Sequence, residues 1–144
     1  MEIMNNNVLI VDDSATIRKM VKRTIRMIGL EVGEFYEAAD GIAALAQLSE
    51  HEIAVMLVDI NMPRMGGVEL LTRMKENERL KDIPIVIAST EGSKTRIDQL
   101  MELGASGYVR KPFQPEQLRE VLLPMLKVTE NAIANDGDFD DGSF

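Results

Sequence analysis

Three uninterrupted apolar runs constrain the fold of this chain more than any other feature. They lie at 8–11, 55–58 and 85–88, and none of them alternates apolar with polar residues. Each run therefore predicts a strand buried on both faces, as in a parallel sheet that is covered by helices. Weaker patterns at 34–39 and 106–110 predict two more strands, an edge strand of mixed polarity and a short one.

Amphipathic segments with helical spacing separate and follow these runs. In the first, apolar residues recur on one face from Ile17 to Ile28, while Ser14 can cap its start and Gly29 can close its end. Similar stripes occupy 42–48, 68–74, 97–101 and 118–125. Pro124 should kink or end the last of these helices. Five repeats of strand and helix predict an α/β fold with a parallel sheet, right-handed crossovers and helices on both faces.

Length and composition suggest one folded domain with short extensions. The chain has 144 residues, enough for a single domain with a substantial core. We expect an N-terminal extension at 1–6, a folded domain at 7–127 and an acidic, mobile tail at 128–144, because the tail has few aliphatic residues and ends in a run rich in aspartate.

Charge and hydropathy exclude several classes of function. The formal net charge of -8 argues against a general nucleic-acid binder. Cysteine is absent, which excludes disulfides, thiolate metal sites and cysteine nucleophiles. No apolar run approaches the roughly 20 residues that span a bilayer, and the first residues do not resemble a signal peptide. We therefore expect a cytoplasmic protein with no membrane span.

Polar side chains follow four of the five expected strands. Asp12 and Asp13 come after the first, Asp59 after the third, Ser89 after the fourth and Lys111 after the fifth. In an open α/β sheet, ligands bind beyond the carboxyl ends of the strands. Each residue taken alone has an ordinary explanation, such as a helix cap, a turn or a surface lysine. Their shared position at one sheet edge favours a functional site.

The chemistry of this group points to a metal and a phosphate. Two unit charges about 4 Å apart repel by about 4 kcal/mol at an effective dielectric near 20, so clustered carboxylates favour a divalent cation. Oxygen ligands suit Mg²⁺ rather than zinc. Lys111 and Ser89 offer a cation and a hydrogen-bond donor to a phosphate. A carboxylate such as Asp59 can then act as the nucleophile and form an acyl phosphate.

Several segments together resemble the signature of response-regulator receiver domains, most of all the stand-alone, CheY-like members. They are Val-Asp-Asp-Ser at 11–14, Asp-Ile-Asn-Met-Pro at 59–63, Ser89, and Gly-Ala-Ser-Gly-Tyr-Val-Arg-Lys-Pro-Phe at 104–113. The resemblance covers about 7–127. It implies a flavodoxin-like, doubly wound (βα)5 fold with a five-stranded parallel sheet in the order 2-1-3-4-5.

The resemblance also implies roles for single residues. Asp59 would be the phosphoacceptor, and Mg²⁺ would be held by Asp12, Asp13, Asp59 and the backbone carbonyl of Asn61. Lys111 would contact the phosphoryl group, and its bond to Pro112 is a candidate for the cis form.

Further implied residues concern switching and the pocket rim. Ser89 and Tyr108 would form the switch, and Asn61, Thr90 and Glu91 would flank the pocket. Phosphate would come from a histidine kinase or a phosphotransfer protein. The output would be a protein target bound at the fourth helix, fifth strand and fifth helix, and the resemblance favours a role in chemotaxis. Two positions depart from the family pattern: Gly66 replaces a usual Asp, and Thr90 a frequent Ala.

Alternative functions stay open from the sequence. A phosphorelay intermediate would pass its phosphate on to a histidine phosphotransfer domain. A haloacid-dehalogenase-like phosphatase would need a second Asp where this chain has Asn61. A flavodoxin-like FMN binder would need a phosphate loop where Asp12 and Asp13 stand. Finally, the first helix carries five basic residues and no acid, which indicates either a docking face for an acidic partner or a solvated helix face.

Overall fold

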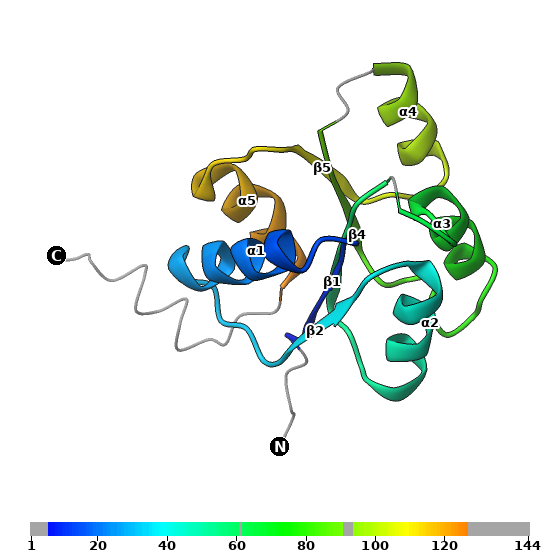
Figure 1. The fold of residues 1–144 in the computed structure, drawn as a ribbon, viewed down its shortest axis with the longest axis horizontal. Helices are drawn as coiled ribbons and strands as arrows, with labels where there is room; N and C mark the ends of the chain where they lie inside the picture. Colours follow the sequence, from blue (N-terminus) through cyan, green and yellow to red (C-terminus); the bar gives the residue numbers. More distant parts are fainter. Residues whose placement is uncertain (1–5, 61, 91–93, 127–144) are drawn as a thin grey trace, which may run out of the picture.

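The computed structural model describes residues 6–60, 62–90 and 94–126. A five-stranded parallel sheet forms its centre, in the order β2-β1-β3-β4-β5 (Figure 1). Its strands are β1 (Val8–Val11), β2 (Phe35–Ala38), β3 (Val55–Val58), β4 (Ile85–Ser89) and β5 (Gly107–Arg110). The helices are α1 (Ala15–Met27), α2 (Gly41–Glu50), α3 (Gly67–Lys75), α4 (Lys94–Glu102) and α5 (Pro115–Leu122), followed by a 3-10 turn η1 (Leu123–Met125). The predicted fold class and strand order are confirmed.

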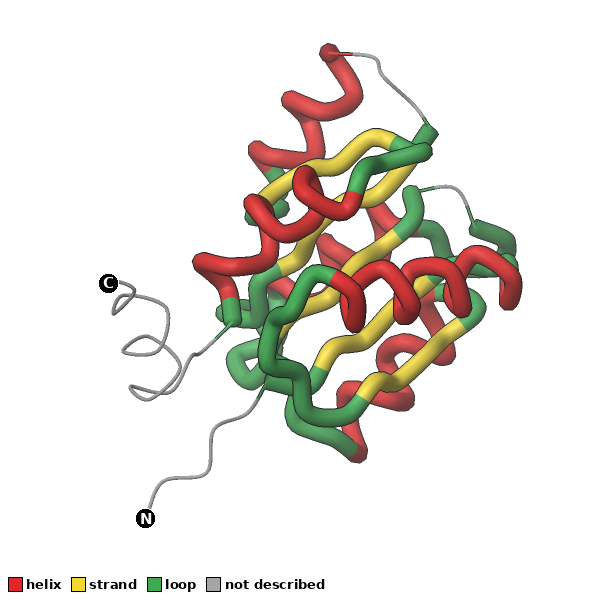
Figure 2. Tube along the Cα trace, turned by 90° about the vertical axis from the view of Figure 1, so that its left-hand side faces the viewer, coloured by secondary structure: helices red, strands yellow, loops and turns green. Residues whose placement is uncertain are grey.

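Helices cover both faces of the sheet and divide the core in two. On one face, Val21 and Ile25 of α1 pack with Leu118 and Leu122 of α5 over the sheet. On the other face, α2, α3 and α4 contribute a larger cluster that includes Met74. Figure 2 shows the strands side by side between the helices. The strands β1, β3 and β4 are buried along their whole lengths, as their uninterrupted apolar sequences require.

Local signals in the sequence account for the ends of the helices. The Ser14 hydroxyl accepts a hydrogen bond from the amide of Ile17 at 3.2 Å and so caps α1. Gly29 follows the end of α1 with a φ of 80°, a conformation that favours glycine. The helix α5 stops at Leu122, and Pro124 lies in the 3-10 turn that follows.

The extensions expected at 1–6 and 128–144 fall almost wholly outside the described residues. Among the helices that the structure describes, none is long and apolar enough to cross a membrane. The fold thus brings the carboxyl ends of five parallel strands to one edge, where the loops after β1, β3, β4 and β5 meet.

Candidate phosphoryl-accepting site

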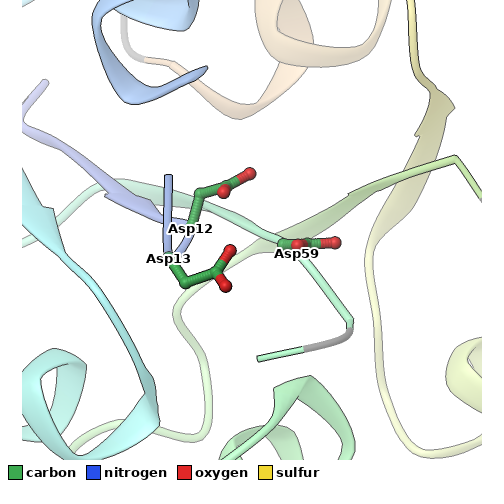
Figure 3. Close-up of side chains that lie close together, drawn as sticks. All are labelled: Asp12, Asp13 and Asp59. Carbon is green, nitrogen blue, oxygen red and sulfur yellow. The ribbon is translucent and has the colours of Figure 1, made fainter. Parts of the chain in front are cut away.

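The carboxylates of Asp12, Asp13 and Asp59 lie together at this edge (Figure 3). Each offers one oxygen, and these three oxygens lie within 4.8 Å of one another. Backbone pairing places them, because the amide of Asp59 donates to the carbonyl of Val11 (2.9 Å) and the amide of Asp12 to that of Ala38 (3.0 Å). The sheet ladder therefore continues one residue past the strands and fixes where both aspartates leave it.

The three carboxylates differ in their exposure to solvent. Asp12 is buried, Asp59 is half-buried and Asp13 is exposed. The group is therefore closed to solvent on the side of Asp12 and open on the side of Asp13. A cleft of about 670 Å³ adjoins the open side and is lined by Asp13, Met62 and Pro63, among others. An all-oxygen donor set with an open side fits a hard divalent cation that keeps some of its water.

Lys111 supplies the positive charge of the site. Its Nζ lies 2.5 Å from Oδ2 of Asp12, and both side chains are largely buried. The amide of Lys111 donates to the carbonyl of Ser89 at 2.8 Å, which joins the ends of β4 and β5. The Lys111–Pro112 peptide bond is cis, as the resemblance implied. The ion pair neutralises one of the three clustered carboxylates.

Contacts that sequence reasoning did not predict hold the turn after β1. Arg18 of α1 donates through Nη1 to the carbonyl of Asp12 (2.6 Å) and through Nε to Oε1 of Glu37 on β2 (2.8 Å). Lys22 also pairs with Glu37 at 2.6 Å. Hydrogen bonds from Lys22 and Arg18 lower the pKa of Glu37. The basic residues of the first helix were visible in the sequence, but their partner on β2 was not.

A second set of contacts anchors the loop between β3 and α3. Arg64 donates through Nε to Oδ2 of Asp40 at 2.7 Å, and the amide of Gly41 donates to the carbonyl of Met65 at 2.8 Å. Asp40 also caps α2, by accepting from the amide of Ala43 at 2.8 Å. That backbone hydrogen bond, and then Arg64, lower the pKa of Asp40. The loop that follows Asp59 is thus tied to the start of α2.

The other residues expected at the site differ in where they lie. Ser89 is buried at the end of β4. Thr90 is exposed and lines a groove against α1, together with Phe113. Tyr108 is half-buried on β5 and packs against the core cluster on the α2–α4 face. Asn61 and Glu91 lie outside the described residues.

Comparison with known proteins agrees with this geometry. The family model of the response regulator receiver domain matches residues 8–123. Chemotaxis protein CheY1 of Helicobacter pylori is 36% identical over 115 residues, which is 79% of this chain and 91% of that protein. The structure of chemotaxis response regulator CheY4 of Vibrio cholerae has a TM-score of 0.74 and 37% identity, and the match covers 85% of this chain and 99% of that one.

A solved structure with a bound metal is also similar. The Mn²⁺-bound form of response regulator Rcp1 has a TM-score of 0.70 and 26% identity, over 86% of this chain and 97% of that chain. Fold, acidic site and relatives define a two-component signalling domain. The chain belongs to the response-regulator receiver family. CheY-like members of this family are signalling switches rather than conventional enzymes. They act between a kinase or phosphotransfer protein and a downstream target.

Proposed function

We propose that this protein is a phosphorylation-activated switch whose phosphoacceptor is Asp59. The observation that carries the proposal is the grouping of three carboxylate oxygens within 4.8 Å of one another, with the ammonium of Lys111 at 2.5 Å from Asp12. This group combines a carboxylate nucleophile with charges that can balance an incoming phosphate. Such a balance is what phosphoryl transfer chiefly demands of a protein.

Asp12, Asp13 and Asp59 would hold Mg²⁺, with the backbone carbonyl of Asn61 as a further ligand. The oxygen-only donor set supports this choice of metal, as does the Mn²⁺-bound form of the similar regulator Rcp1. When bound, the cation would offset the negative charge of the phosphoryl group. Asp13, which is exposed beside the open cleft, leaves room for water and for the donor.

Phosphoryl transfer to Asp59 replaces one bond to phosphorus with another. A carboxylate oxygen of Asp59 forms a bond to phosphorus, the bond from phosphorus to the donor breaks, and the donor group leaves with that electron pair. The product is an acyl phosphate. Lys111 contacts the phosphoryl oxygens and donates charge-assisted hydrogen bonds. The protein thereby catalyses its own Mg²⁺-dependent phosphorylation, and hydrolysis of the acyl phosphate resets it.

Ser89 and Tyr108 would carry the signal away from Asp59. A phosphoryl group adds negative charge and acceptor oxygens next to the end of β4, where the buried Ser89 can turn towards it and donate a hydrogen bond. Tyr108 then turns inwards and changes the surface formed by α4, β5 and α5. Asn61, Thr90 and Glu91 would set how long the phosphate survives.

The phosphate would come from a histidine kinase or phosphotransfer protein in the cytoplasm, and the output would be binding to a chemotaxis target protein. The names of the H. pylori and V. cholerae relatives favour chemotaxis. A phosphorelay intermediate is the alternative. Efficient transfer from the phosphorylated protein to a histidine phosphotransfer domain would favour the relay, and binding to a motor switch protein only after phosphorylation would favour chemotaxis.

Labelling with a small phosphodonor tests the central claim. Wild-type protein with Mg²⁺ should take up radioactive phosphate in a form that alkali releases, as expected of an acyl phosphate. Asp59→Asn should take up none, and Asp82→Asn, at an exposed aspartate outside the site, should behave like the wild type. Equal labelling of Asp59→Asn would refute the proposal.

A further inference from the structure

A groove between α1 and the loop that leads from β5 to α5 is the feature that the proposed function does not use. It measures about 290 Å³ and is lined mainly by apolar groups of Ile17, Met20, Val21, Pro112 and Phe113. Close packing leaves few gaps of this size inside proteins. This groove lies at the surface and has room for a side chain. Met20 on its rim is 54% exposed.

Positive charge flanks this groove along the outer side of α1. The helix has five basic residues and no acidic one. Arg18 and Lys22 are committed to Glu37, and Arg26 lies over the ring of Phe35 at 5.0 Å. Lys19 and Arg23 are exposed and have no ion-pair partner among the described residues. The surface therefore suits a segment in which an aromatic side chain is flanked by acids.

The chain itself contains such a segment. Residues 128–144, which lie outside the described residues, include five acidic residues and no Lys, Arg or His. Within them Phe139 stands between Asp138 and Asp140. The described chain also ends on the face of the sheet that α1 covers, because Leu126 is buried in the same cluster as Val21 and Ile25 of α1.

Reach and attachment both favour this occupant. Twelve residues lie between Leu126 and Phe139, so the intervening chain can extend to about 40 Å, while α1 is only about 20 Å long at about 1.5 Å per residue. Attachment through a short linker gives a local concentration on the order of millimolar. A weak contact of one aromatic ring and a few charges is enough under those conditions.

We propose that residues 128–144 bind along α1 of the same molecule, with Phe139 in the groove and the neighbouring aspartates against Lys19 and Arg23. The bound segment covers the side of the site where Lys111 and Thr90 border the groove. It therefore obstructs a protein phosphodonor that approaches over α1 and leaves a small phosphodonor unhindered. This regulatory consequence rests on the proposed function; the binding itself does not.

The absence of cysteine makes a direct test possible in the full chain. A nitroxide on Ser143→Cys should broaden the amide resonances of α1 near Met20 and Arg23 in the unphosphorylated protein, and spare those of Arg73 on α3. Met20→Ser should remove the broadening, whereas Met27→Ser, at a methionine of the same helix that is also exposed but does not line the groove, should retain it. Salt at about 1 M, where the Debye length is about 3 Å, should weaken it.

Two results would overturn the proposal. One is equal broadening of α1 and α3, or none at all. The other is equally strong broadening in a mixture of nitroxide-labelled protein without isotope enrichment and isotope-enriched protein without nitroxide, because the occupant would then be a second copy. For the regulatory step, Phe139→Ser should speed phosphorylation by a histidine-phosphorylated protein and leave the rate with a small donor unchanged. Broadening of α1 in a protein that no donor phosphorylates on Asp59 would refute the proposed function and leave the binding intact.

Discussion

Lys111 and Asp12, which stand near opposite ends of the folded sequence, form a short ion pair at one edge of the sheet. The Nζ–Oδ2 distance is 2.5 Å, and the two residues are 99 positions apart in the sequence. Asp12 is also one of the three clustered aspartates that could hold a metal ion. The same carboxylate therefore faces two cations, the ammonium of Lys111 and the proposed Mg²⁺. Because a positive charge at a shared ligand repels a second one, Lys111 should weaken the binding of metal before phosphate arrives and assist it afterwards.

Replacement of Lys111 by methionine should separate these two effects. Without the competing ammonium, Mg²⁺ should bind on the order of tenfold more tightly, as measured by isothermal titration calorimetry. Phosphorylation by a small donor should nevertheless slow on the order of a hundredfold, the usual cost of losing one group that stabilises a developing charge. Without metal the variant should unfold at a lower temperature, since Asp12 is left buried without its counter-charge.

Lys94→Met provides the matched control for this prediction. Lys94 is also a lysine paired with an aspartate, Asp98, but its side chain is 88% exposed and lies on α4. An exposed pair contributes little to stability, so neither Mg²⁺ affinity nor phosphorylation should change. Equal Mg²⁺ affinity in wild type and Lys111→Met would show that the lysine does not compete with the metal.

Arg18 is expected to position the acidic turn, although it touches no carboxylate of the metal group. Arg18→Met removes its hydrogen bonds to the carbonyl of Asp12 and to Glu37. We expect a loss of about 1.5–3 kcal/mol in the free energy of unfolding, typical of charge-assisted hydrogen bonds, together with weaker Mg²⁺ binding. Arg73→Met, at an exposed pair with Glu69 on α3, should change neither. A stability loss with unchanged Mg²⁺ affinity would limit Arg18 to a structural role.

Much of the fold follows from the sequence because its signals are local. The apolar runs predict β1, β3 and β4 within one residue, and Ser14 and Pro124 mark helix ends where the structure has them. The order of the strands in the sheet, in contrast, cannot be predicted from local signals. Periodicity predicts five βα units, but only the resemblance to a known family implied the order 2-1-3-4-5, since many arrangements satisfy the same local pattern.

The sequence predicts which residues lie at the site, but not which of their side chains pair with one another. Asp12, Asp13, Asp59 and Lys111 each follow a strand, and parallel strands bring such residues to one edge. Which cation pairs with which carboxylate depends on side-chain packing between distant segments. Arg64, for example, reaches Asp40 from a left-handed backbone conformation, with a φ of 66°. Nothing in the local sequence signals that conformation for an arginine.

The lowered pKa of Asp40 predicts how stability depends on pH. Folding lowers this pKa through the amide of Ala43 and through Arg64, so the stabilisation is complete above the unfolded value, about 3.9. It disappears as the pH falls through the lower value of the native state. Asp40→Asn keeps the helix cap but loses the charge. Urea unfolding should therefore find the variant less stable than wild type at neutral pH, with the gap closing below about pH 4. A constant gap would contradict this account.

The close approach of α3 to the backbone of Asp59 makes Gly67, the first residue of that helix, sensitive to substitution. A Cβ on Gly67 would lie 2.9 Å from the carbonyl oxygen of Asp59 and 3.0 Å from Cα of Ile60, whereas one on Gly66 would meet the Ile60 oxygen at 3.1 Å. Gly67→Ala should cost about 1–3 kcal/mol, as overpacking does, and should slow phosphorylation because Asp59 must shift. Gly66→Ala should have a smaller effect on both. Chemical denaturation and small-donor labelling measure the two quantities, and equal effects of the two variants would contradict the role assigned to this contact.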